Sequence, residues 1–221
     1  DLYKLPLQEK KAILCSCIYG IDIDIHAVEV AKFSLLIKLI EDETAPSVAE
    51  VVPILPDLGD NIQFGNSLVS QVELNGISGD NNQIMEIVPF DWSDINNGCS
   101  FDVIIGNPPY VNTEGMHTLL PSAEVEVYKR KYKTSHKQFD KYFIFIEQAI
   151  NKIKENGFVC YIVPNKFFKI GAGEKLRNLI AKEQMLVSLD DFGDAQLFED
   201  KTIYSSIILL SKAIQPTFVY S

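Results

Sequence analysis

Asn107, Pro108, Pro109 and Tyr110 follow an apolar run, residues 101–105, that has the composition of a buried strand. Proline has no backbone donor and pushes the residue before it to extended geometry, so strand pairing is expected to stop here. The side-chain oxygen of Asn107 and the carbonyl of Pro108 are two acceptors on a stiff turn. They match the two donors of a planar amino group.

This pair of acceptors predicts chemistry on nitrogen. A conjugated amine is a weak nucleophile, and hydrogen bonds that draw its lone pair out of conjugation activate it. Each such bond, if stronger in the transition state, supplies about 1 to 3 kcal/mol, or one to two decades of rate. Tyr110 adds a ring face for a flat substrate, worth roughly 1 to 3 kcal/mol per base. The alternative is a turn that only ends the strand, with Tyr110 in the core.

The surrounding chain alternates between predicted strands and helices, which favours an α/β fold with a doubly wound, mostly parallel sheet. Such sheets bind their ligands beyond the carboxyl ends of the strands. The predicted strands are residues 13–23, a short one ending at 65–66, 101–105, 158–163, 186–192 and 203–210. The predicted helices are residues 25–40, with Asp24 as N-cap, 139–154 and 173–182. The predicted loops are residues 44–60 and 112–137.

Three polar clusters, residues 22–24, 65–67 and 107–110, follow predicted strands. Because the carboxyl ends of parallel strands share one edge of a sheet, we expect these clusters to line a ligand site.

The composition is that of an ordinary globular protein of 221 residues, predicted to form one domain with the segment 112–137 as an insert near the substrate. No apolar run reaches the length of a membrane span and the N-terminus lacks the layout of a signal peptide, so a cytoplasmic protein is expected. The three histidines are scattered, and no metal is predicted. The net charge of −10 argues against a broad nucleic-acid surface on this chain alone.

The sequence "DVIIGNPPYV" resembles the catalytic motif of the adenine-specific DNA methyltransferases of restriction-modification systems, which use S-adenosylmethionine. The resemblance continues over nearly the whole chain, and its last segment is similar to the Eco57I-like and type IIG members. The matching segments are "IYGIDIDIHAVEVAKFSL", "FGNSL", "KENGFVCYIVPNKFF" and "LDDFGDAQLFEDKTIYSSIILL". The resemblance implies a Rossmann-like methyltransferase fold and methyl transfer to the exocyclic amine of a flipped adenine.

On the cofactor side, the resemblance implies that Asp22 accepts hydrogen bonds from the ribose hydroxyls and that Ile23 packs on the cofactor adenine. Asn66, followed by Ser67, stands where the family often has an aspartate that holds the cofactor's amino group. Helix capping is the alternative for Asp22, although Asp24 is the more natural cap.

On the substrate side, the resemblance makes Asn107, Pro108 and Tyr110 the catalytic residues, with Pro109 beside them. A base flipped out of the duplex recovers its stacking in the pocket, and Tyr110 is expected to form one wall. The candidates for a second wall are Phe167 and Phe168, with core packing as the alternative. Many relatives have an aromatic residue just before a "GxxLR" sequence, where this chain has Ala172 and Gly173.

A basic cluster, Lys129, Arg130 and Lys131, follows the catalytic motif in this acidic chain. A loop here is placed to contact the phosphates that flank a flipped base. The alternative is the solvated face of a helix.

No glycine-rich loop precedes Ile18, so we expect a catalytic domain truncated at its N-terminus, without the strand that separates those ending at Asp22 and Gly106. An interrupted sheet, self-association and little activity of the fragment alone are expected to follow. Double-stranded DNA is the expected partner, bound through the full-length protein and its target-recognition domain. Two other functions stay open: methylation of a protein glutamine, which is also a planar amide, and a non-catalytic binding or regulatory domain.

Overall fold

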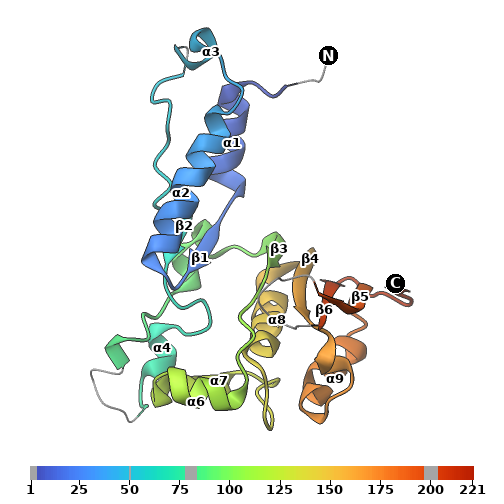
Figure 1. Cartoon of the computed structure of the whole chain (residues 1–221). Coiled ribbons are helices and arrows are strands. Elements are labelled where there is room, and N and C mark those ends of the chain that lie inside the picture. The colour runs from blue at the N-terminus through green and yellow to red at the C-terminus, as the bar shows by residue number, and fades with distance from the viewer. Residues whose placement is uncertain (1–3, 50, 78–83, 197–203) are drawn as a thin grey trace. The chain divides into compact units, whose positions relative to one another are not determined.

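The computed structural model describes residues 4–49, 51–77, 84–196 and 204–221 (Figure 1). It divides into two compact units, each described here by itself. The N-terminal unit comprises Asp1–Val72 and Val88–Cys99, and the C-terminal unit comprises Glu73–Ile87 and Ser100–Ser221. Within the described ranges, every helix is too short or too polar to cross a lipid bilayer.

The N-terminal unit contains a pair of parallel strands whose register places Asp22 opposite Phe64. The predicted helix over residues 25–40 is confirmed, and the Asp24 carboxylate caps it by accepting from the His26 backbone N at 2.8 Å. The elements of the unit are α1 (Leu7–Cys17), β1 (Gly20–Asp22), α2 (Ile25–Ile40), α3 (Ala45–Ala49), β2 (Ile62–Phe64), η1 (Trp92–Asp94) and η2 (Asn96–Gly98). Helix α3 interrupts what was predicted to be a loop over residues 44–60.

The prediction of a strand over residues 13–23 is wrong for its first half. Residues 13–17 are the end of helix α1, and only Gly20–Asp22 form a strand. A short apolar run does not distinguish a buried strand from a helix; here Leu7 and Leu14, seven residues apart, face the same side of a helix. The residues that pack on this face favour the helix, because the face completes a buried cluster of Leu7, Leu14, Leu39, Val51 and Leu58.

Helix α1 ends against the buried side chain of Asn61. The amide nitrogen of Asn61 donates to the backbone carbonyls of Cys15 and Ile18, each at 2.9 Å. A long-range side chain therefore satisfies carbonyls that the end of a helix leaves without an intrahelical donor.

We predict that Asn61→Ala lowers the free energy of unfolding of the N-terminal unit by about 1 to 3 kcal/mol, because two partly buried carbonyls lose their donor. Urea unfolding followed by the fluorescence of Trp92, the single tryptophan of the chain, measures this. Gln8→Ala, at an exposed position of α1, is the matched control. Equal unfolding midpoints for the two variants would contradict the capping role of Asn61.

The C-terminal unit contains a mixed sheet in the strand order β3-β4-β6-β5-β7. Strands β3 and β4 are parallel, whereas β6 runs antiparallel to both β4 and β5. Helix α8 packs on β4 (Figure 1). The elements are β3 (Phe101–Gly106), α6 (Thr113–Leu119), α7 (Ser122–Lys131), α8 (Lys141–Lys152), β4 (Ile153–Pro164), η3 (Asn165–Phe168), η4 (Gly171–Gly173), α9 (Glu174–Lys182), β5 (Leu186–Gln196), β6 (Tyr204–Ser211) and β7 (Val219–Tyr220), with α4 (Gln71–Leu74) where the chain passes from one unit to the other.

The predicted alternation of strands and helices is confirmed, with small shifts of their ends. Helix α8 ends at Lys152, and β4 starts at Ile153, five residues before the predicted strand. In the described residues β1 pairs with β2 and β3 pairs with β4, so the strands form two separate sheets.

The prediction of a long loop over residues 112–137 is wrong, because helices α6 and α7 occupy most of this segment. The segment is polar in composition, yet the two helices bury one face. Glu124 and Tyr128 are both buried, and the Tyr128 hydroxyl donates to the Glu124 carboxylate. The other buried residues of the two helices are Met116, Ala123, Val125 and Val127.

Candidate functional site

The turn that carries Asn107 lies at the carboxyl end of β3, as predicted. The register with β4 places Gly106 opposite Tyr161, and a Cβ atom on Gly106 would lie 3.2 Å from the Tyr161 ring. The backbone thus enters the turn through a close contact that favours glycine. Asn107 is exposed and Pro108 is buried.

Tyr110 is held to the neighbouring strand by its hydroxyl group. The hydroxyl oxygen lies 3.1 Å from the carbonyl oxygen of Ile162 in β4 and also within hydrogen-bond distance of Asn107 Oδ1. A phenol has one hydrogen, so it donates to one of these acceptors at a time. The half-buried ring meets Tyr142 edge to face, with centroids 6.2 Å apart.

Partial burial raises the pKa of the Tyr110 phenol above its ordinary value of 10.0. The hydroxyl therefore keeps its hydrogen, and its ability to donate, at neutral and moderately alkaline pH.

An aromatic cluster of Tyr142, Phe167 and Phe168 lies behind Tyr110. Phe167 is buried and meets Tyr142 with centroids 6.2 Å apart, so it packs in the core. Phe168 is partly exposed, and its ring centroid lies 4.2 Å from that of Phe167. Of the two predicted candidates for a second wall, Phe168 is the one that is partly exposed.

Gly173 is the glycine of the "GxxLR" sequence, and Ala172 stands before it where many relatives have an aromatic residue. Gly173 itself has no room for any side chain. A Cβ atom at this position would lie 2.2 Å from the carbonyl oxygen of Phe167 and 2.8 Å from Arg177 Nη1. Arg177 Nη1 donates to the same carbonyl and to that of Ile170, which seats α9 on η3. This close packing accounts for a glycine at position 173, and the neighbouring Ala172 has no ring to form a second wall.

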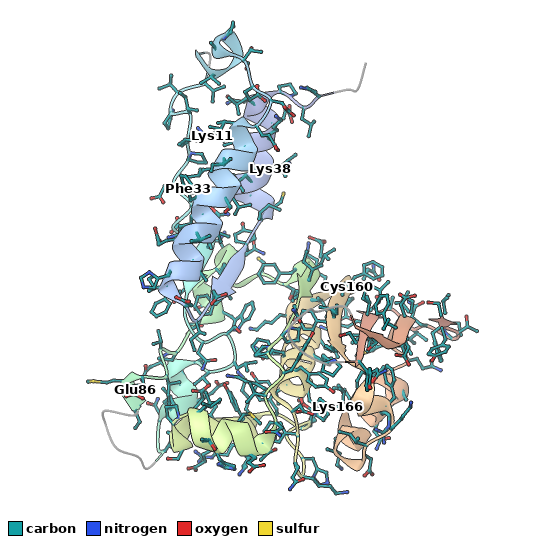
Figure 2. All side chains as sticks on the ribbon, in the orientation of Figure 1. Lys11, Phe33, Lys38, Glu86, Cys160 and Lys166 are labelled. Carbon is teal, nitrogen blue, oxygen red and sulfur yellow. The ribbon has the colours of Figure 1, made fainter. Side chains whose placement is uncertain are left out.

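An open pocket of about 300 Å³ lies beside Tyr110. Lys166 lies in the segment that follows β4 (Figure 2). It forms an ion pair with Asp140, directly before α8, at the wall of the pocket. The lining residues are Tyr110, Val111, Asn112, Gly115, Leu119, Asp140 and Lys166. Neither Asp140 nor Lys166 was predicted from the sequence, although Asp140 precedes an apolar helix and Lys166 adjoins Phe167.

The basic cluster forms the last turn of α7 and is not a loop. Arg130 pairs with Glu126 at 3.7 Å, and Lys131 pairs with Glu73 at 2.8 Å. Lys129 is exposed, and its ammonium lies 3.4 Å from His117 Nε2. Cations are favoured at the C-terminus of a helix, so this placement agrees with the helix-face alternative.

Asp22 and Asn66 are two of the predicted cofactor ligands. Asp22 is the last residue of β1, and Asn66 lies two residues after the adjacent parallel strand β2. The Gly65 backbone N donates to the Asp22 carbonyl at 2.8 Å, which holds the two strand ends together. The exposed Asp22 carboxylate accepts from the Asp24 backbone N, and Ile23 is 52% exposed. A carboxylate and an apolar side chain are thus accessible at the carboxyl end of β1.

Asn66 and Ser67 shape the turn that follows β2. Asn66 is buried, and its Oδ1 atom accepts from the Leu68 backbone N at 3.1 Å. The carbonyl oxygen of Ser67 accepts from the indole nitrogen of Trp92 at 2.9 Å. Both residues therefore have a structural role in this turn.

Residues 16–198 match the model of the Eco57I restriction-modification methylase family. The chain belongs to this family. It is 45% identical over 218 residues to the type II restriction enzyme and methyltransferase RM.Eco57I of Escherichia coli, covering 99% of this chain and 21% of that protein. It is 31% identical over 113 residues to the type II methyltransferase M.PaeR7I of Pseudomonas aeruginosa, covering 51% and 19%. The chain spans about a fifth of the length of these curated relatives.

Solved structures agree on the fold. The cryo-EM structure of the DrdV–DNA complex matches with a TM-score of 0.65 at 14% identity, over 98% of this chain and 22% of that one. A nuclease-deletion mutant of the type ISP restriction-modification enzyme LlaGI, in complex with a DNA substrate mimic, matches with a TM-score of 0.61 at 13% identity, over 98% and 19%. The predicted Rossmann-like methyltransferase fold is confirmed.

We predict that the Tyr110 phenol ionises with a midpoint above pH 10, because burial disfavours the phenolate. The absorbance at 295 nm during a pH titration, taken as the difference between wild type and Tyr110→Phe, isolates this group from the other tyrosines. Since the raised pKa favours the protonated folded state, the stability that this group contributes is complete below pH 10 and is lost as the pH rises above it. A midpoint below pH 10 would contradict the burial of the hydroxyl.

We predict that Gly173→Ala destabilises the C-terminal unit by about 1 to 3 kcal/mol, because the new methyl group overlaps the Phe167 carbonyl. Gly171→Ala is the matched control in the same short helix, since nothing lies within 4 Å of its added Cβ. Chemical denaturation of both variants measures the difference. Equal stability of the two would contradict the close contact at position 173.

Proposed function

We propose that this protein is an S-adenosylmethionine-dependent DNA methyltransferase that methylates the exocyclic amine of adenine as part of a restriction-modification system. The observation that carries the proposal is the turn from Asn107 to Tyr110 at the carboxyl end of β3, in a chain of the Eco57I methylase family. Two acceptors and an aromatic face together suit a planar amine on a flat ring.

In this proposal the adenine amine donates one hydrogen to Asn107 Oδ1 and the other to the carbonyl of Pro108. Tyr110 then directs its hydroxyl to the Ile162 carbonyl, 3.1 Å away, which leaves Asn107 Oδ1 to the amine. Both bonds draw the nitrogen lone pair out of conjugation with the ring. Because they strengthen as positive charge develops on the nitrogen, they lower the barrier to its attack on a methyl group.

The base reaches this turn by rotating out of the duplex, which costs a few kcal/mol of stacking and pairing. Stacking on Tyr110, with Phe168 as the proposed second wall and Pro109 beside it, recovers part of that cost. Exposed cations on α7, Lys129 and Arg130, are proposed contacts to the DNA backbone.

The cofactor supplies an electrophilic methyl group when it is bound. The accessible carboxylate of Asp22 and the exposed side chain of Ile23 fit the ribose hydroxyls and the base of an adenosine. Asn66 and Ser67 are proposed to meet the cofactor's amino end through the turn that they shape.

The relatives named above are restriction enzymes and methyltransferases, which supports DNA over a protein glutamine as the substrate. The same finding argues against a non-catalytic binding domain.

We predict that the full natural protein, expressed in a host without DNA methylation, places N6-methyladenine at one sequence context, and that Asn107→Ala lowers this transfer by about 10- to 100-fold or more. Sequencing that detects modified bases measures both. Asn178→Ala, at an exposed position of α9, is the matched control and is expected to behave as wild type. Unmodified adenine in the wild-type strain, or full activity of Asn107→Ala, would overturn the proposed function.

A further inference from the structure

The pocket beside Tyr110 contains an ion pair that the chemistry at Asn107 does not use. Lys166 Nζ lies 3.1 Å from one carboxylate oxygen of Asp140 and 3.0 Å from the other. The Asp140 side chain is only 4% exposed, whereas that of Lys166 is 48% exposed. A buried carboxylate therefore holds an accessible ammonium group at a defined position.

The wall that carries this pair is tied to the catalytic turn. The Lys141 backbone N donates to the Val111 carbonyl at 2.7 Å, and Asn112 forms an antiparallel bridge with Asp140. Thr113 Oγ1 donates to the Phe139 carbonyl at 2.8 Å. Residues just after Tyr110 and residues just before α8 thus form one rigid support, and the position of Lys166 is set relative to that of Tyr110.

The chemistry of the lining favours an acceptor-rich, negatively charged ligand. Among the lining residues only Asp140 and Lys166 carry charge, and burial of the carboxylate leaves the positive end of the pair facing the pocket. Asn112 Oδ1 already accepts from the Gly115 backbone N at 2.8 Å, so its amide presents the nitrogen, a donor, to a ligand. Leu119, which is 71% exposed, and Val111 supply an apolar surface next to these donors.

We propose that this pocket binds the phosphodiester of the extruded nucleotide. Lys166 and Asn112 donate to the phosphate oxygens, and the apolar surface of Val111 and Leu119 packs on the deoxyribose. The volume of about 300 Å³ accommodates a sugar and its phosphate, and the shared wall places them beside a base stacked on Tyr110. Asp140 is a positioning residue that acts through Lys166. The inference rests on the proposed function and extends it to the nucleotide's backbone.

The test uses the full natural protein and duplex oligonucleotides that carry its methylation site, with a single uncharged methylphosphonate at the phosphate 5′ or 3′ of the target adenine. For the wild type, one of the two replacements is expected to raise KM for DNA about tenfold with kcat nearly unchanged. For Lys166→Met the KM on unmodified DNA rises by a similar factor, and the same methylphosphonate adds no further penalty. The slope of the logarithm of the DNA-binding constant against the logarithm of the salt concentration is expected to be smaller in magnitude by about 0.9 for this variant.

Two further variants separate contact from folding. Lys166→Arg keeps the charge and the pair, and is expected to retain near wild-type KM. Asp140→Asn combined with Lys166→Met removes both charges, so no lone carboxylate stays buried, and it is expected to match Lys166→Met. Lys182→Met, at an exposed lysine of α9, is the matched control and keeps the full penalty of the methylphosphonate.

Equal methylphosphonate penalties in wild type and in the uncharged variants would overturn the inference, as would a wild type that tolerates both replacements. If KM rises only with adenine analogues that lack a ring nitrogen, Lys166 contacts the base and not the phosphate, and the inference is overturned as well. In each of these outcomes methyl transfer by the wild type persists, so the proposed function stands. If the wild type methylates no DNA at all, both the proposed function and this inference are overturned.

Discussion

The attachment of the turn from Asn107 to Tyr110 to its sheet depends on side chains, because Pro108 and Pro109 have no backbone donors to join a strand ladder. The Tyr110 hydroxyl replaces such a ladder on one side through its bond to the Ile162 carbonyl of β4. On the other side, the Lys141 backbone N holds the Val111 carbonyl to the start of α8. A turn that cannot pair with its neighbours is thus fixed between two elements that are far away in the sequence.

Burial around this turn has electrostatic consequences. The edge-to-face contact with Tyr142 covers part of Tyr110, and the resulting desolvation raises the pKa of its phenol and preserves its hydrogen. The buried Asp140 carboxylate is compensated by Lys166, because an unpaired charge at that depth would cost several kcal/mol. Burial therefore preserves a donor at Tyr110 and requires a compensating cation at Asp140.

The sequence predicted the strand ends that carry polar residues, and the structure confirms all three positions. It failed where a pattern is compatible with two structures. The apolar run at residues 13–17 is helical because α1 completes a core with α2, and the polar segment 112–137 is helical because Glu124 and Tyr128 satisfy each other in the interior. The partners of α1 on α2 lie outside the local pattern, whereas Glu124 and Tyr128 have helical spacing that the polar composition of the segment outweighed.

The sequence by itself determined the chemistry of the motif, since an asparagine, two prolines and a tyrosine in succession dictate local geometry and supply the acceptors and the ring. Only the tertiary structure decided what surrounds them. The pairing of Asp140 with Lys166 and the core position of Phe167 against Tyr142 both depend on contacts between distant segments. Local residue types determine which groups are present, whereas long-range packing determines which of them a substrate can reach.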